Sequence, residues 1–141
     1  MNYRPKKVAV LGSGVMGSGI ACHLANVGMD VIMLDIVTPK LSDNDSKSKF
    51  HRNKLVNSAL QKTIKSKPAP LYHKSFSSRI KTGNFEDDFD KISESDWIIE
   101  VVVENLEIKK QIFEKVDKHR KNGSLVSSNT SSIPINLLAQ D

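Results

Sequence analysis

The sequence has little cysteine and no long apolar run. Cys22 is the only cysteine among 141 residues, so the chain cannot form a disulfide within itself. No apolar stretch approaches the roughly eighteen residues that a membrane helix requires. Residues 1–7 are polar and basic, and they lead directly into a short strand pattern instead of a secretory apolar segment. We therefore expect no membrane span and a reducing, cytoplasmic location.

Acidic residues are absent from the middle of the chain. Residues 46–85 contain ten Lys or Arg and no Asp or Glu, whereas the rest of the chain holds eleven basic and all sixteen acidic residues. The net charge of +5 is therefore local, and we expect no nucleic-acid partner. The basic stretch is interpreted as a solvated face, or alternatively as a surface that attracts a phosphate-bearing partner.

Short apolar runs alternate with helical patterns along the chain. Buried strands are expected at Lys7–Leu11, Asp30–Asp35, 79–83, 96–103 and 123–128. Apolar residues at helical spacing follow the first strand as far as Gly28, and they recur between the last two strands. Strands that are apolar on both faces are typical of parallel sheets. The pattern predicts an α/β fold, a Rossmann-type doubly wound parallel sheet.

The stretch between the second and third expected strands is longer than one crossover requires. Apolar residues recur there at helical spacing from Leu55 to Ile64, and the prolines of KPAPLY end that helix. We therefore predict one domain over residues 1–141, with a helical insertion at about residues 42–76.

The turn after the first strand carries the pattern Gly-x-Gly-x-x-Gly. Gly12 permits a tight turn, Gly14 lets a pyrophosphate approach the backbone, and Gly17 lets helix and strand pack closely. The free N–H groups and the positive dipole end of the next helix then face the phosphates. Such glycine patterns also occur in turns without a ligand, but this one lies between a strand and a helix. The context predicts a dinucleotide site.

Asp35 ends the second expected strand, 18 residues after Gly17. A carboxylate at this place accepts hydrogen bonds from the adenosine ribose hydroxyls and repels the additional phosphate of NADP. The predicted cofactor is therefore NAD. The alternative interpretation of Asp35 is a solvated strand end.

Two further stretches carry a resemblance to a known family. VVVENLEIKKQIFEKVD at 101–117 and SSNTSSIPI at 127–135, together with the glycine turn and Asp35, resemble the NAD-binding domain of the L-3-hydroxyacyl-CoA dehydrogenases of fatty-acid β-oxidation. The likeness covers nearly the whole chain. It implies an oxidoreductase that converts an L-3-hydroxyacyl-CoA substrate to the 3-oxo compound with NAD. KPAPLY and the N-terminal place of the domain are similar to bifunctional members that also carry an enoyl-CoA hydratase part.

The resemblance also implies roles for individual residues. Ser131 matches the family serine whose hydroxyl binds the substrate's 3-oxygen, which makes it the candidate catalytic residue. Glu104 and Asn129 match residues that line the nicotinamide and its ribose, and Lys109 matches a lysine close to the same part of the cofactor. The alternatives are a helix N-cap for Ser131 or Ser132, a turn residue for Asn129, and surface helix charges for Glu104 and Lys109. No metal site is expected, because the histidines show no ligand spacing.

The family places a histidine, the general base, about twenty residues after the serine. The sequence reaches Asp141, ten residues after Ser131, and contains no such segment. It also lacks the helical C-terminal domain that closes over the acyl chain and forms the dimer in relatives. The resemblance therefore implies a homo-oligomeric parent enzyme and a 141-residue piece that is inactive alone. The alternatives are another NAD-dependent dehydrogenase of the β-hydroxyacid type and a non-catalytic NAD-binding module.

Overall fold

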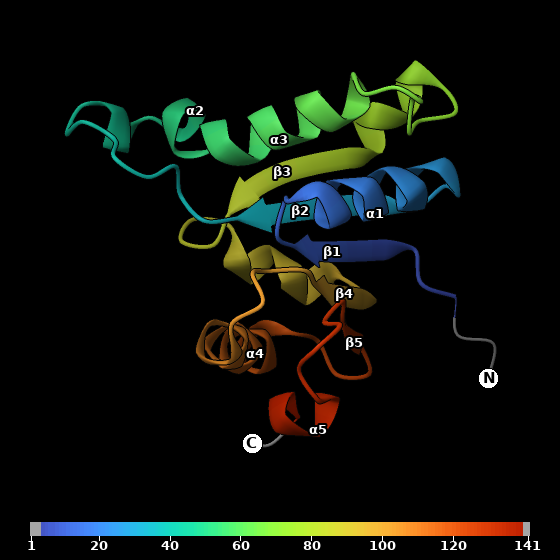
Figure 1. Ribbon diagram of the computed structural model, residues 1–141, viewed down its shortest axis with the longest axis vertical. Coiled ribbons are helices and arrows are strands. Elements are labelled where there is room, and N and C mark those ends of the chain that lie inside the picture. The colour runs from blue at the N-terminus through green and yellow to red at the C-terminus, as the bar shows by residue number, and fades with distance from the viewer. Residues whose placement is uncertain (1–3, 140–141) are drawn as a thin grey trace.

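The computed structural model describes residues 4–139, so positions 1–3 and 140–141 of the predicted domain lie outside the described residues. A five-stranded parallel sheet carries helices on both faces (Figure 1). The strands are β1 (Lys7–Leu11), β2 (Asp30–Asp35), β3 (Ile80–Asn84), β4 (Trp97–Glu100) and β5 (Leu125–Ser128). The α-helices are α1 (Val15–Asn26), α2 (Lys49–Arg52), α3 (Lys54–Ile64), α4 (Leu106–His119) and α5 (Ile135–Leu138). Three 3-10 helices span Asp45–Lys47, Lys74–Arg79 and Phe89–Glu94.

The sheet has the strand order β3-β2-β1-β4-β5, with β1 at its centre. Val8 of β1 is in register with Val31 of β2 on one side and with Trp97 of β4 on the other. The strand order changes direction at β1. In sheets of this topology a ligand binds beyond the carboxyl ends of the strands at the point of reversal. The predicted Rossmann-type doubly wound sheet is confirmed.

Alternate strand residues build a hydrophobic core on each face of the sheet. On one face, strand residues pack against α1 and α3; this core includes Val8, Val10, Cys22, Leu24, Val31, Met33, Val56, Leu60 and Ile99. On the other face, they pack against α4 and the 3-10 helix Phe89–Glu94; this core includes Ala9, Leu11, Leu34, Phe89, Ile92, Ile98, Ile112 and Val116. Each fully buried aliphatic side chain contributes about 1.5–3 kcal/mol. The two cores hold the carboxyl ends of β1, β2 and β4 in place.

The fourth strand is shorter than the sequence predicts. The apolar run favours a strand over 96–103, but β4 ends at Glu100. Beyond it, Val101 N donates to Leu11 O at 2.8 Å, and the chain then turns away from the sheet. Val103 is 65% exposed. The prediction was wrong for residues 101–103 because apolar composition alone does not separate a buried strand from an apolar loop.

The other boundaries differ from the predictions by one or two residues. β3 covers Ile80–Asn84 instead of 79–83, and β5 begins at Leu125 instead of position 123. Helix α1 ends just before Gly28, as predicted, and Gly28 has a φ of +89°. No pattern in the sequence indicated the 3-10 helix Phe89–Glu94, which replaces a crossover α-helix between β3 and β4.

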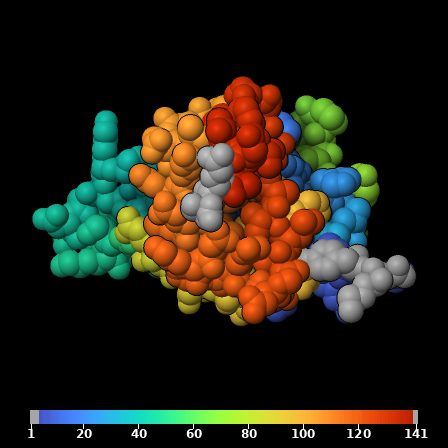
Figure 2. Space-filling model, turned by 90° about the horizontal axis from the view of Figure 1, so that it is seen from below, coloured from blue at the N-terminus to red at the C-terminus, as the bar shows by residue number. Residues whose placement is uncertain are grey.

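The stretch between β2 and β3 contains α2, α3 and two of the 3-10 helices. Helix α3 packs against α1 and buries Val56 and Leu60. Figures 1 and 2 both show the teal segment around Asp45–Lys47 and α2 projecting from the body. Arg52 fastens this segment to the loop after β3, because its guanidinium pairs with Glu86 and Asp87 at 2.7 Å each. Among residues 4–139 no helix is long and apolar enough to cross a membrane.

Candidate functional site

The turn between β1 and α1, the glycine turn (residues 12–17), lies at the carboxyl edge of the sheet. Gly12 has a φ of +118°, and a Cβ atom there would lie 2.5 Å from the Val101 carbonyl oxygen. A Cβ atom at Gly17 would lie 2.0 Å from the Gly12 carbonyl oxygen. Neither position has room for a side chain, and the φ of Gly12 disfavours one in addition. The first and third glycines therefore serve the close packing that the motif predicts.

Gly14 is in a different environment. It is the N-cap of α1, and a Cβ atom there would meet nothing within 4 Å. The first N–H groups of a helix have no partner within the helix, and with the helix dipole they favour an anion. The space over Gly14 therefore fits a pyrophosphate group that approaches the backbone closely.

Asp35 is tied to the glycine turn. Its Oδ2 accepts hydrogen bonds from Ser13 N at 2.7 Å and Ser13 Oγ at 2.5 Å, and its Oδ1 accepts one from Ile36 N at 2.7 Å. The side chain is half-buried. A carboxylate has about four acceptor positions, so at least one is left for a ribose hydroxyl. The position suits the predicted role, although Asp35 also has a structural one.

The residues around Ser131 form a turn, and Glu104 binds the residue on each side of Ser131. We call residues 128–132 the serine turn. Glu104 Oε1 accepts hydrogen bonds from Thr130 Oγ1 and, at 2.9 Å, from Ser132 Oγ. Ser131 lies between these two anchors, is exposed, and makes no side-chain hydrogen bond within residues 4–139. Helix α5 has Pro134 as its N-cap, without a side-chain capping bond, so Ser131 does not cap it.

Asn129 is the second exposed side chain of the serine turn. Its backbone N donates to Glu100 O at 2.8 Å, which extends the β4–β5 pairing by one residue. Its side-chain amide makes no hydrogen bond within the described part of the chain. Asn129 and Ser131 thus present free polar groups at the carboxyl edge of the sheet.

Lys109 is not the surface charge that one interpretation predicts. It is 1% exposed, in the first turn of α4 after the N-cap Asn105. Its Nζ lies 2.7 Å from Glu100 Oε1, 3.2 Å from Val102 O and 3.3 Å from Glu104 Oε2. An ammonium group has three donors, so this set satisfies all of them. Lys109 therefore contacts Glu104, which in turn binds the serine turn.

Glu104 is ionised over nearly the whole pH range. The hydrogen bond from Thr130 is the main cause that lowers its pKa to about 2, with further lowering from Ser132 and Lys109. Each of these donors favours the charged carboxylate over the neutral acid. The group is an acceptor and an anchor, and its low pKa makes it a poor general base at neutral pH.

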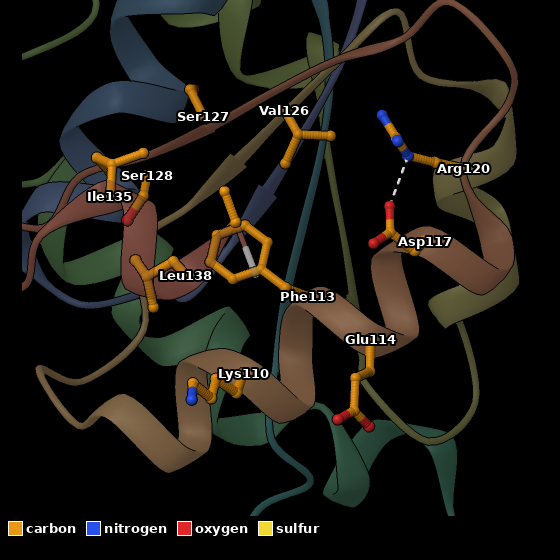
Figure 3. A pocket seen from close by; sticks show the side chains of 11 residues that line it. Lys110, Phe113, Glu114, Asp117, Arg120, Val126, Ser127, Ser128, Ile135 and Leu138 are labelled. Atoms are coloured by element: carbon orange, nitrogen blue, oxygen red, sulfur yellow. Dashed lines mark ion pairs between the residues drawn. The ribbon is translucent and has the colours of Figure 1, made fainter. Parts of the chain in front are cut away.

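A separate cavity of about 590 Å³ lies between α4, β5 and α5 (Figure 3). Phe113, Val126 and Leu138 supply apolar walls, and the Asp117–Arg120 ion pair of 2.8 Å lies at its rim. Figure 2 shows the red segment with α5 over the orange α4 region. None of the predicted site residues lines this cavity, although Ser128 of the serine turn does, so the cavity is separate from the glycine turn.

The carboxyl edge of the sheet thus combines the glycine turn, the carboxylate of Asp35 and the serine turn that Glu104 binds. Residues 7–141 match the family model described as 3-hydroxyacyl-CoA dehydrogenase, NAD binding domain. The chain belongs to this family. The family is one of oxidoreductases, and the cofactor of this domain is NAD. The match decides against a dehydrogenase of another family, whereas the contacts of the individual site residues with NAD stay predictions.

Known relatives agree with this assignment. A protein named probable 3-hydroxyacyl-CoA dehydrogenase from Bacillus subtilis (strain 168) is 53% identical over 146 residues, covering 99% of this chain. Fatty acid oxidation complex subunit alpha of Psychrobacter arcticus is 34% identical over 95% of the chain. The chain spans 18% and 17% of these two relatives. The crystal structure of (S)-3-hydroxybutyryl-CoA dehydrogenase from Ralstonia eutropha superposes with a TM-score of 0.67 at 31% identity, over 96% of this chain and 44% of that one.

Sequence reasoning missed one residue that the structure places at the centre of the site. Glu100 is fully buried at the end of β4, where it binds Lys109 and accepts hydrogen bonds from Val102 N and Ser128 Oγ. The available signal was a single carboxylate inside the apolar run WIIEVVV. A buried charge is stable only when it is paired and hydrogen-bonded, so a carboxylate in such a run indicates a partner elsewhere.

Proposed function

We propose that this chain is the NAD-binding part of an enzyme that interconverts L-3-hydroxyacyl-CoA and 3-oxoacyl-CoA in fatty-acid β-oxidation. The observation that supports this most directly is the free hydroxyl of Ser131, with Thr130 and Ser132 on either side bound to Glu104. A hydroxyl held in this way can donate a hydrogen bond to the 3-oxygen of a substrate. The names of the Bacillus and Psychrobacter relatives support an acyl-CoA substrate and fatty-acid oxidation.

In this proposal each residue binds or orients one part of the reactants. The glycine turn holds the pyrophosphate, and Asp35 accepts hydrogen bonds from the adenosine ribose. Glu104 and Asn129 line the nicotinamide and its ribose, with Lys109 behind Glu104. NAD held by these residues would supply the hydride acceptor for carbon 3 of the substrate. Ser131 orients the oxygen on that carbon and does not attack it.

The reaction also needs a base for the hydroxyl proton. His23 lies in the last turn of α1 and His119 in the last turn of α4. Crossover helices run opposite to the parallel strands, so both lie toward the edge of the sheet away from Ser131. His51 and His73 belong to the stretch between β2 and β3. No hydrogen bond or ion pair within residues 4–139 joins any of the four histidines to the serine turn, so in this proposal the chain binds cofactor and orients substrate without one of them as the base.

The cofactor half of the proposal is tested by titrating the chain with NADH and NADPH in a calorimeter. We expect NADH to bind and NADPH to bind much more weakly, because the Asp35 carboxylate repels the 2′-phosphate. Asp35→Ala should weaken NADH binding about tenfold, the value of a hydrogen bond to a charged group, and should narrow the difference from NADPH.

Asp30→Ala is the matched control, because Asp30 begins the strand that Asp35 ends. It should leave both affinities unchanged. Equal affinity of the unmodified chain for the two cofactors would contradict the role of Asp35. The homo-oligomeric assembly of the parent enzyme and the cytoplasmic location remain predictions.

A further inference from the structure

We propose that Glu100 is a positioning residue for the nicotinamide half of the cofactor site, acting through Lys109 and Ser128. The inference rests on the proposed function, because it assumes that NAD lies across the carboxyl edge of the sheet. Glu100 itself is fully buried, so it touches neither cofactor nor substrate. We expect it to affect the position of the residues that line the cofactor site.

The contacts of Glu100 lead to the serine turn by two routes. In the first, Glu100 Oε1 binds Lys109 Nζ at 2.7 Å, and Lys109 lies 3.3 Å from Glu104, which holds Thr130 and Ser132. In the second, Glu100 Oε2 accepts a hydrogen bond from Ser128 Oγ, and that hydroxyl accepts one from Thr130 N at 3.2 Å. Both routes end on the residues that flank Ser131.

The position of this network in the sheet assigns it to one half of the cofactor. The strand order reverses at β1, where the glycine turn would hold the pyrophosphate. Asp35 lies on the β2 side of that point, the side of the adenosine. Glu100 ends β4 and Ser128 ends β5, both on the opposite side. A disturbance at Glu100 should therefore reach the nicotinamide half and spare the adenosine half.

The burial of the pair makes its charges interdependent. Lys109 is 1% exposed and Glu100 is 0% exposed, so removal of one charge leaves the other in a medium of low dielectric. After loss of the Glu100 charge, Glu104 is the remaining carboxylate that Lys109 contacts among residues 4–139. Lys109 would then draw Glu104 inward, away from Thr130 and Ser132. The free hydroxyl of Ser131 would lose its fixed position.

The experiment compares NADH with ADP, which carries the adenosine and both phosphates but no nicotinamide ribose. Glu100→Gln removes the charge but keeps the shape of the side chain and an oxygen that accepts from Val102 N. The amide group can still pair with Ser128, but there it donates to Ser128 Oγ, whereas the carboxylate accepts from it. We expect its dissociation constant for NADH to rise about tenfold and that for ADP to stay within about twofold of the unmodified chain. Glu107→Gln is the matched control, since Glu107 is an exposed carboxylate in the first turn of α4. It should change neither constant.

The double variant E100Q/K109M controls for a folding defect caused by an unpaired buried charge, because it removes both charges at once. It should fold and should also bind NADH about tenfold more weakly, with ADP binding retained. Unchanged NADH affinity in either variant, or an equal loss for NADH and ADP, would overturn the positioning role and leave the proposed function standing. A lack of NADH binding by the unmodified chain would overturn both.

Discussion

The glycines of the turn differ in what a methyl group would meet, and this separates their contributions to folding and to binding. A Cβ atom at Gly17 would lie 2.0 Å from the Gly12 carbonyl oxygen, whereas one at Gly14 would meet nothing within 4 Å. The Gly14 backbone, with φ −58° and ψ −174°, is accessible to alanine. The motif therefore has two positions that the fold keeps small, Gly12 and Gly17, and we expect the ligand to require the small residue at the third, Gly14.

Alanine substitutions at these two positions should give opposite results. Gly17→Ala should lower the free energy of unfolding by about 1–3 kcal/mol, because the helix must move off the strand. Gly14→Ala should change it by less than about 0.5 kcal/mol but weaken NADH binding about tenfold or more, because the methyl group fills the space of the pyrophosphate. Urea unfolding and NADH titration of both variants measure the two effects. Tight NADH binding by Gly14→Ala would show that the pyrophosphate lies elsewhere.

At the residue scale, the motif predicts the roles that depend on backbone shape. The close packing of Gly12 and Gly17 and the open space at Gly14 follow from the spacing alone. The burial of Lys109 does not, because its partner Glu100 is nine positions away and belongs to a strand. Charged side chains are almost never buried unless paired, and a sequence pattern shows the charge without its partner.

At the element scale, Glu104 joins the loop after β4 to the serine turn, and this link should depend on pH. Its pKa in the folded chain is about 2, below the usual 4.5 of a glutamate, so the folded state favours the charged form. The stability that Glu104 contributes is then complete above its unfolded pKa and is lost as the pH falls toward about 2.

Glu104→Gln should therefore be less stable than the unmodified chain at about pH 6 and converge with it as the pH falls through this range. Urea unfolding at a series of pH values measures the difference. Glu107→Gln, which removes an exposed carboxylate three residues later in the first turn of α4, should follow the unmodified chain throughout. A constant gap between Glu104→Gln and the unmodified chain at every pH would exclude the charged link.

The elements themselves were predictable where the apolar pattern and a glycine agreed. β1, β2 and the end of α1 at Gly28 lie where the sequence places them.

The basic run between β2 and β3 was less informative. Arg52 pairs with acidic residues from outside the run, whereas Lys62, Lys65 and Lys67 are exposed and make no ion pair within residues 4–139. The choice between a solvated face and a phosphate-binding surface therefore concerns these lysines.

At the scale of the whole molecule, the chain has the NAD-binding domain of its family, but no histidine within residues 4–139 makes a hydrogen bond to the serine turn. We expect it to oxidise NADH with acetoacetyl-CoA at a rate close to the background. The loss of a general acid or base costs about a hundredfold to ten-thousandfold, and the loss of substrate positioning adds to it. The absorbance of NADH measures the rate.

The comparison is the homologous Bacillus enzyme, of which this chain spans 18%. A rate within about tenfold of that enzyme would show that the base lies among these 141 residues. An inactive Bacillus enzyme under the same conditions would favour a role in NAD binding without catalysis.

The central place of β1 also has a consequence during synthesis of the chain. Val8 pairs with Val31, 23 residues later, but its other neighbour is Trp97, 89 residues later. Closing so long a loop costs entropy before the new contact stabilises anything, and ribosomes add about 5–20 residues per second. The strand that leads into the glycine turn therefore remains unpaired on one side for seconds after it has been synthesised. The glycine turn therefore contacts the residues that follow β4 only after β4 has left the ribosome.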